Sequence, residues 1–246
     1  MKVISIIPAR YNSIRFPGKL MEILGKKTVI LNTYENVLAT NLFNDVIVAT
    51  DSQIIFNEIN QNGGKVVMTK NSHKCGSDRI AEAVSGIDAD IVINIQGDEP
   101  FIDLISLKKL IDIFKDDKEK SIQLASLMTE FKYPEESTNP TNVKVVVDLN
   151  NFALYFSRAL IPYSRESNLK PIYYKHIGVY AFRKNALLEF SKLETTPLEA
   201  SEKIECIRYL EHGKKLKMIY TDKINLGIDT PEDLARAQAY MKEMNL

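Results

Sequence analysis

Three cationic side chains cluster near the amino end of the chain, in a segment suited to holding phosphates. Arg10, Arg15 and Lys19 stand within ten positions, directly after the apolar run Val3–Ile7. Arginine can grip phosphate oxygens through paired hydrogen bonds, lysine supplies a compact point charge, and Gly18 lets the backbone approach a ligand closely. Such groups can stabilise the charge that grows on a departing pyrophosphate. The alternative is an ordinary solvated loop with three surface charges.

This cationic segment does not match two common nucleotide-binding patterns. A Walker A loop needs Ser or Thr after its Gly-Lys pair, whereas Leu20 follows Gly18-Lys19, and the segment is not a Gly-x-Gly-x-x-Gly turn. Kinase and dehydrogenase functions are therefore disfavoured. Because the segment follows the first predicted strand, it should lie at the carboxyl edge of the sheet, where open α/β sheets bind ligands.

Two aspartates are candidates for holding a divalent cation. Asp98 follows the predicted strand Ile91–Ile95, and Mg²⁺ prefers oxygen ligands, usually one or two carboxylates together with phosphates and water. The adjacent Glu99 is expected to point elsewhere, because neighbouring strand residues alternate faces. Asp229 ends the segment Leu226–Asp229, just before a predicted helix. Its alternative role is simply to stabilise the positive end of that helix.

The elements that must position these residues alternate between short apolar runs and amphipathic stretches, which predicts βαβ units and a mainly parallel sheet. Strands are expected at Val3–Ile7, Val46–Ala49, Val66–Met68 and Ile91–Ile95. Helices are expected at Val29–Ala39, Ile54–Asn60 and Arg79–Val84. The first half of the chain is therefore predicted to be a nucleotide-binding α/β layer.

The second half of the chain has an antiparallel character. Asn150-Asn151 lies between Val143–Val147 and Phe152–Phe156, and asparagine tolerates the positive φ that hairpin turns require. Further elements are predicted at His176–Phe182 and Leu216–Tyr220 (strands) and at Ala200–Leu210 and Leu234–Met244 (helices), the last capped by Thr230-Pro231. We therefore expect one α/β domain over residues 1–246, with a mixed, mainly parallel sheet flanked by helices and an antiparallel region inserted at about 130–185.

The bulk composition excludes several classes of protein. The chain has 246 residues, and its 32 Lys plus Arg balance its 32 Asp plus Glu. No overall field would attract nucleic acid or an anionic membrane, so neither partner is expected. The first apolar run is too short for a signal peptide, and no run approaches the ~18 apolar residues of a membrane span. Cys75 and Cys206 indicate neither a disulfide framework nor a zinc site, which favours the cytoplasm.

In this order, the motifs resemble the 3-deoxy-manno-octulosonate (Kdo) cytidylyltransferases, the CMP-Kdo synthetases of lipopolysaccharide synthesis. The resemblance spans essentially the whole chain. It rests on Ile7–Arg10, Phe16–Lys19, Val48–Asp51, Asn94–Pro100, Asn142–Val147, Ala153–Pro162, His176–Tyr180 and Asp229–Leu234. The resemblance implies a Rossmann-like nucleotidyltransferase fold and a Mg²⁺-dependent homodimer, with the antiparallel region serving sugar binding and dimerisation.

The resemblance also implies roles for individual residues. The metal would be held by Asp98 and Asp229. CTP would be bound by Arg10, Ser13, Arg15, Lys19, Arg79 and Gln96, with Arg10 and Lys19 on the triphosphate. The acidic sugar would be bound by Arg158, His176, Tyr180 and Glu205. An arginine can pair with the sugar carboxylate while the other three contact hydroxyls. Each of three residues also has an alternative role. Arg158 could form a surface ion pair, Tyr180 could be a core aromatic, and Glu205 could lie on a solvated helix face.

The chain departs from the family pattern at two places. Cys206 follows Glu205 where the family has Gln, so a thiol with weak hydrogen-bonding ability replaces an amide and leaves acceptor selectivity open. The loop His73–Arg79 differs from the family pattern as well, and its Cys75 is a candidate for sensitivity to thiol reagents.

The expected reaction is attack of the sugar's anomeric hydroxyl on the α-phosphorus of CTP, with release of pyrophosphate and formation of CMP-Kdo. Catalysis would come mainly from positioning and charge neutralisation, and no separate general base is assigned. Two alternatives are CMP activation of another acid sugar, such as 8-amino-Kdo or a sialic acid, and a non-catalytic nucleotide sensor on the same fold.

Overall fold

A computed structural model of the protein describes residues 1–13, 15–73, 75–166, 171–223 and 227–244. Ile14, Lys74 and Leu226, which belong to segments considered above, lie outside the described residues. The chain divides into two compact units, residues 1–107 with 225–246, and residues 108–224. The first unit therefore combines the two ends of the chain.

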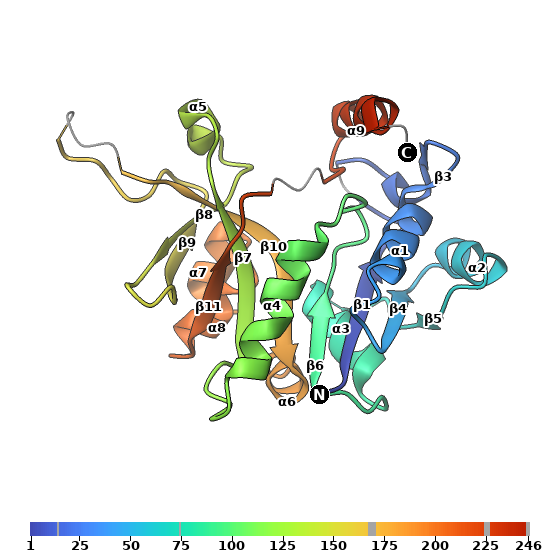
Figure 1. The fold of residues 1–246 in the computed structure, drawn as a ribbon, viewed down its shortest axis with the longest axis horizontal. Coiled ribbons are helices and arrows are strands. Elements are labelled where there is room, and N and C mark those ends of the chain that lie inside the picture. Colours follow the sequence, from blue (N-terminus) through green and yellow to red (C-terminus); the bar gives the residue numbers. More distant parts are fainter. Residues whose placement is uncertain (14, 74, 167–170, 224–226, 245–246) are drawn as a thin grey trace. The chain divides into compact units, whose positions relative to one another are not determined.

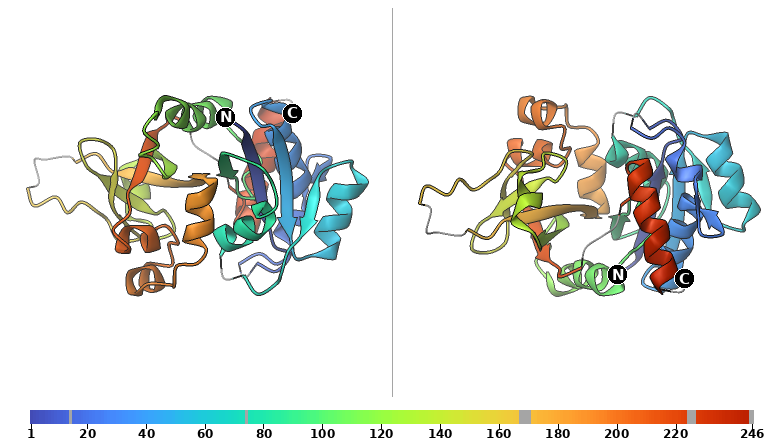
Figure 2. Two further views of the ribbon diagram at one scale, coloured as in Figure 1. Left: turned by 90° about the horizontal axis from the view of Figure 1, so that it is seen from below. Right: turned by 90° about the horizontal axis from the view of Figure 1, so that it is seen from above.

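The first unit is built on a parallel sheet in the order β6-β1-β4-β5 (Figure 1). Every residue of β1 is buried, because this strand has a neighbour on each side and helices α1 and α3 on opposite faces (Figure 2). The elements are β1 (Val3–Ala9), the 3-10 helix η1 (Lys19–Met21), β2 (Ile23–Leu24), β3 (Lys27–Thr28), α1 (Val29–Ala39), β4 (Asp45–Thr50), α2 (Gln53–Gln61), β5 (Val66–Met68), α3 (Gly76–Val84), β6 (Ile91–Asn94) and α9 (Pro231–Met244).

The strands and helices predicted for the first half are confirmed, with small shifts at their ends. Local capping explains two of the helix starts. The Thr28 hydroxyl accepts a hydrogen bond from the Leu31 amide (3.3 Å) at the start of α1, and Ser52 caps α2 in the same way through Ile55 (3.5 Å). Such caps satisfy backbone donors that have no partner within the helix.

The closing helix α9 belongs to the first unit. It begins at Pro231, where the Thr230 hydroxyl accepts from the Asp233 amide (3.3 Å) and the Asp233 carboxylate accepts from the Thr230 amide (2.9 Å). The Tyr240 ring packs edge-on against Phe101, with ring centroids 4.9 Å apart. These contacts hold the last segment of the chain, and Asp229 with it, against the first unit.

The second unit is mainly antiparallel. β10 pairs antiparallel with β7 and β8, β8 pairs antiparallel with β9, and β11 pairs parallel with β7. The elements are β7 (Leu124–Glu130), α5 (Pro134–Thr138), β8 (Lys144–Val147), β9 (Ala153–Ser157), β10 (Tyr174–Arg183), α6 (Lys184–Phe190), α7 (Pro197–Glu202), α8 (Ile207–Glu211) and β11 (Leu216–Tyr220), with α4 (Leu104–Asp116) crossing the boundary between the units. The predicted hairpin is confirmed, and Asn151 in its turn has φ 58°. The α/β fold with a mixed, mainly parallel sheet is confirmed as well.

The prediction of one helix over Ala200–Leu210 is wrong. The segment forms two short helices, α7 and α8, because Lys203 adopts a left-handed conformation (φ 55°) and its amide donates to the Glu199 carbonyl. The intervening turn buries Ile204 and Cys206. Glu205 therefore lies in a turn and not on a helix face.

Candidate active site

Lys19 is the centre of a cluster of charges in the first unit. Its ammonium pairs with the Asp98 carboxylate and with the Asp229 carboxylate (2.9 Å), and Arg15 pairs with the same Asp229 oxygen (2.9 Å). Lys19 is only 9% exposed. Burial disfavours its ammonium form, but the two aspartates outweigh this effect, so the pKa of Lys19 lies above its ordinary value. Asp98 and Asp229, which lie 79 and 210 positions from Lys19 in the sequence, thus both bind its ammonium nitrogen.

Backbone contacts bring the two aspartates together. The amide of Ile228 donates to the Asp98 carbonyl (2.9 Å), which fastens the segment before α9 to the end of β6. Gly227 packs against the Glu99 carboxylate, where a Cβ would stand 2.9 Å from Oε1. Glu99 is therefore directed at this backbone, and the Asp98 carboxylate is directed at Lys19.

Asp229 is not the residue that caps α9, because Thr230 and Asp233 perform that role. Its own carboxylate is directed at Lys19 and Arg15. Burial favours the neutral acid, but the two cations outweigh this effect and hold the pKa of Asp229 below its usual range. The carboxylate is therefore ionised at neutral pH and able to bind cations.

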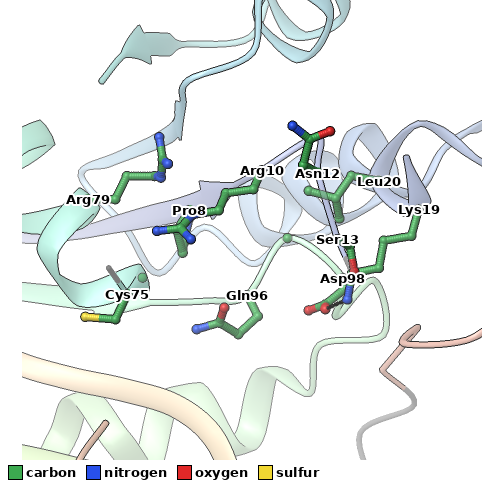
Figure 3. Close-up of a pocket in the computed structure, with 12 residues that line it drawn as sticks. Pro8, Arg10, Asn12, Ser13, Lys19, Leu20, Cys75, Arg79, Gln96 and Asp98 are labelled. Atoms are coloured by element: carbon green, nitrogen blue, oxygen red, sulfur yellow. Dashed lines mark hydrogen bonds and ion pairs between the residues drawn. The ribbon is translucent and has the colours of Figure 1, made fainter. Parts of the chain in front are cut away.

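A pocket of about 250 Å³ opens beside this charge cluster. It is lined by Pro8, Arg10, Asn12, Ser13, Lys19, Leu20, Cys75, Gly76, Arg79, Gln96, Gly97 and Asp98. Figure 3 shows Lys19 directed at Asp98 at one end, Arg79 and Cys75 at the other, and Gln96 between them. The structure thus places in one pocket all the residues predicted to bind CTP except Arg15, which reaches Asp229 from the adjoining loop.

The polar side chains of this pocket are held by specific partners. Arg79 is fully buried and bonds to Asp51 (Oδ2, 2.6 Å) and to the Thr69 hydroxyl. Arg10 donates to the His73 carbonyl, and Gln96 donates to Asn94 (3.1 Å). Asp51 and Thr69 were not predicted to have a role. Their positions in the sequence could have indicated a role in the site, because each stands just after the end of a parallel strand, β4 or β5.

Asp98 and Asp229 form a donor set that fits a divalent cation accompanied by phosphates. Within the described ranges, no group of three or more His, Cys, Asp or Glu side chains could hold a metal ion. Mg²⁺ does not need such a group, since it is commonly bound by one or two carboxylates together with substrate phosphates. The two carboxylates already share one positive charge, the Lys19 ammonium.

The residues predicted to bind the sugar lie in the second unit. Arg158 directly follows β9, and its guanidinium donates from Nε to the Glu202 carbonyl (2.8 Å) and from Nη1 to the Pro140 carbonyl (3.0 Å). Both partners are neutral backbone groups. A guanidinium has further N–H donors beyond these two bonds, so Arg158 keeps its charge and donors for an anion. It is not part of a surface ion pair among the described residues.

His176 and Tyr180 lie together on β10, with ring centroids 5.5 Å apart. Burial lowers the pKa of His176 to about 3, so its imidazole is neutral, and its Nε2 lies 2.9 Å from the Ser126 hydroxyl. Ser126 Oγ is also 2.8 Å from the Val179 carbonyl, to which it can donate its single proton.

Cys206 is buried behind Tyr180. It is 1% exposed, hydrogen bonds with the Tyr180 side chain, and burial raises the pKa of its thiol. The Cys206 thiol therefore packs against a residue that was predicted to bind the sugar. Neither Cys75 nor Cys206 forms a disulfide. No helix in the described part of the chain has the length and apolar character needed to cross a membrane.

The comparison with known proteins first defines the class. Residues 4–216 match the Cytidylyltransferase family model, and the chain belongs to that family. The chain is 57% identical to a 3-deoxy-manno-octulosonate cytidylyltransferase of Flavobacterium johnsoniae, covering 99% of this chain and 100% of the relative. It is 56% identical to the protein of the same name from Christiangramia forsetii, covering 96% of each.

A solved structure agrees with these relatives. The structure of CMP:2-keto-3-deoxy-manno-octonic acid synthetase complexed with CTP matches with a TM-score of 0.93 and 36% identity, covering 99% of this chain and 100% of that one. The resemblance to the 3-deoxy-manno-octulosonate cytidylyltransferases, predicted from the order of the sequence motifs, is confirmed.

Proposed function

We propose that this nucleotidyltransferase joins CMP from CTP to the anomeric hydroxyl of 3-deoxy-D-manno-octulosonate, releasing pyrophosphate and forming CMP-Kdo. The observation that carries the proposal is the meeting of Arg15, Lys19, Asp98 and Asp229 beside a pocket lined by Arg10 and Arg79. Relatives named for this activity match the chain over their full length. The product is a precursor for lipopolysaccharide biosynthesis, and we place the reaction in the cytoplasm.

The reaction forms one bond and breaks one. The acceptor oxygen bonds to the α-phosphorus, the bond between the α- and β-phosphates breaks, and pyrophosphate leaves while the hydroxyl proton passes to solvent. Arg10, Arg15 and Lys19 would hold the phosphates and stabilise the charge that grows on the leaving group. Ser13, Arg79 and Gln96 would orient the rest of the nucleotide in the pocket.

Asp98 and Asp229 would hold a Mg²⁺ ion. When bound, Mg²⁺ supplies charge neutralisation and Lewis-acid polarisation of the phosphates. The Lys19 ammonium pairs with both carboxylates, which holds them close to each other.

In the second unit, Arg158 would bind the sugar carboxylate, because its guanidinium is fixed in place without a carboxylate partner. His176, Tyr180 and Glu205 would contact the sugar hydroxyls, the histidine as a neutral group. We propose that residues 1–246 act as one nucleotidyltransferase domain and that the region at about 130–185 also forms a homodimer.

The decisive assay combines purified protein with CTP, Kdo and Mg²⁺ and measures pyrophosphate release, with each component omitted in turn. Release that requires all three is the expected result. A parallel panel containing 8-amino-Kdo and a sialic acid identifies the preferred acceptor. Binding of CTP without pyrophosphate release for any acid sugar would contradict the proposal and support a nucleotide sensor.

A further inference from the structure

Lys144, on β8, is the most deeply buried cation among the described residues of the second unit. Lys144 is 0% exposed, and its ammonium donates to the carbonyls of Asn142 (2.7 Å), Asn139 (3.2 Å) and Arg158. An ammonium has three N–H donors and a neutral amine has only two, so three carbonyl acceptors match the charged form. Burial lowers the pKa of Lys144, and the nearby Glu202 opposes that shift.

Two of these carbonyls belong to the loop that also binds the Arg158 guanidinium. Asn139 and Asn142 stand on either side of Pro140, whose carbonyl accepts from the Arg158 guanidinium (3.0 Å). The third carbonyl is that of Arg158 itself. The Lys144 ammonium nitrogen therefore binds both the loop at 139–142 and the backbone of Arg158.

Glu202 also binds Arg158, at both its backbone amide and its guanidinium. Its carboxylate accepts from the Arg158 amide (2.9 Å) and from the Ser157 hydroxyl (2.6 Å), and its carbonyl accepts from Arg158 Nε (2.8 Å). The carboxylate thus binds the backbone of Arg158 and leaves the guanidinium charge unpaired. With Lys144 in place, the guanidinium is held in one orientation by neutral groups only.

We propose that Lys144 is a positioning residue for acceptor binding, which acts by holding the Arg158 guanidinium in the orientation that receives the acceptor carboxylate. This inference rests on the proposed function, in which Arg158 binds that carboxylate. Lys144 touches neither substrate. Its loss would release the loop at 139–142 and let the guanidinium leave its orientation, since three buried carbonyls would lose their donor.

The test is steady-state kinetics of pyrophosphate release for Lys144→Met, Arg158→Ala and the double variant, each with Kdo and with CTP varied. Lys144→Met should raise the KM for Kdo about tenfold and leave the KM for CTP unchanged, because a misplaced binding group costs about one to two orders of magnitude. In the Arg158→Ala background Lys144→Met should cause no further rise, since both changes remove the same interaction. Lys214→Met, which removes a half-buried cation of the same unit that pairs with Glu189, is the matched control.

A second variant separates positioning from folding. Lys144→Gln keeps two N–H donors without the charge and should raise the KM for Kdo less than Lys144→Met does. An unchanged KM for Kdo in a folded Lys144→Met protein, or effects of Lys144→Met and Arg158→Ala that multiply, would overturn the inference. So would a failure of Lys144→Gln to fold, which would make the lysine structural. The proposed function fails separately, if wild-type protein releases no pyrophosphate with Kdo or if Arg158→Ala leaves the KM for Kdo unchanged.

Discussion

The two units hold their functional cations in opposite ways. In the first unit, Lys19 and Arg15 are paired with ionised aspartates, and the buried Arg79 is paired with Asp51. In the second unit, among the described residues, the ammonium of Lys144 and the guanidinium of Arg158 donate to backbone carbonyls. The first arrangement balances opposite charges, and the second holds an oriented positive charge on neutral groups.

This difference suits the two ligands proposed. A triphosphate that arrives with a divalent cation brings both signs of charge, so Asp98 and Asp229 would hold the cation and Lys19 would bind phosphate. A sugar carboxylate brings one negative charge and no cation, so it is best met by an unpaired guanidinium. Breaking a buried ion pair by removing one partner is costly, about 3–5 kcal/mol, which makes the paired cluster of the first unit sensitive to substitution.

The largest effect is expected at the paired cluster, for Asp98→Asn. This change removes a proposed metal ligand while keeping the shape of the side chain, and turnover should fall by at least about a thousandfold. The measurement is kcat for pyrophosphate release at saturating Mg²⁺, with thermal unfolding as a check of folding. Asp45→Asn, whose half-buried carboxylate pairs with Lys65, is the control and should leave kcat unchanged. Near-normal turnover of Asp98→Asn would exclude the metal role.

Lys19→Ala removes a cation of the same paired cluster. Loss of the ammonium removes a group that would stabilise the leaving pyrophosphate, so kcat should fall by about a hundredfold to a thousandfold. Binding of Mn²⁺ without nucleotide, followed by electron paramagnetic resonance, should tighten, because the ammonium no longer competes for the two carboxylates. Lys65→Ala serves as the matched control. Unchanged turnover in Lys19→Ala would count against this assignment.

Arg158→Ala tests the unpaired cation of the second unit. Loss of a charge-assisted interaction should raise the KM for Kdo by about tenfold to a hundredfold, since hydrogen bonds to charged groups are worth about 1.5–3 kcal/mol. The KM for CTP should not change. A rise in both constants, or in that for CTP alone, would show that Arg158 does not serve the acceptor side.

The smallest effect concerns pH and the neutral His176. Its pKa of about 3 in the folded protein lies below the ordinary 6.5, so the unfolded chain binds the proton more readily. The stability contributed by the neutral histidine is complete above about pH 6.5 and is lost as pH falls toward 3, by up to about 1.4 kcal/mol per pH unit.

Urea unfolding of wild type and His176→Gln between pH 7 and pH 5 measures this effect. The wild type should lose more stability on acidification than the variant, which has no group titrating at this position. Parallel pH profiles for the two proteins would show that His176 takes up a proton without difficulty in the folded state, and the neutral contact to the sugar would then be wrong.

The sequence predicts the fold well where apolar residues are periodic and turn residues mark the ends. The helix Val29–Ala39 and the strands Val66–Met68 and Leu216–Tyr220 have the predicted boundaries. The segment Ala200–Leu210 has helical spacing too, but the left-handed Lys203 divides it, and lysine has no intrinsic preference for that conformation that would reveal the break.

The site is predictable to the extent that its residues stand at strand ends. Asp98 follows β6 and the cationic segment follows β1, so the parallel sheet places them at one edge. Asp229 required the resemblance to the family, because its local sequence fits a helix cap equally well. Lys144 and Glu202 went unpredicted, since they act through backbone carbonyls and amides that no residue type reveals.

The most direct test is a crystal structure with CTP and a divalent cation, which would show where the triphosphate binds. We expect Lys19 Nζ to contact phosphate oxygens in place of the aspartates, Arg10 and Arg15 to contact the same phosphates, and Asp98 and Asp229 both to coordinate the cation. A triphosphate bound away from these side chains, with Lys19 still paired to both aspartates, would contradict this expectation.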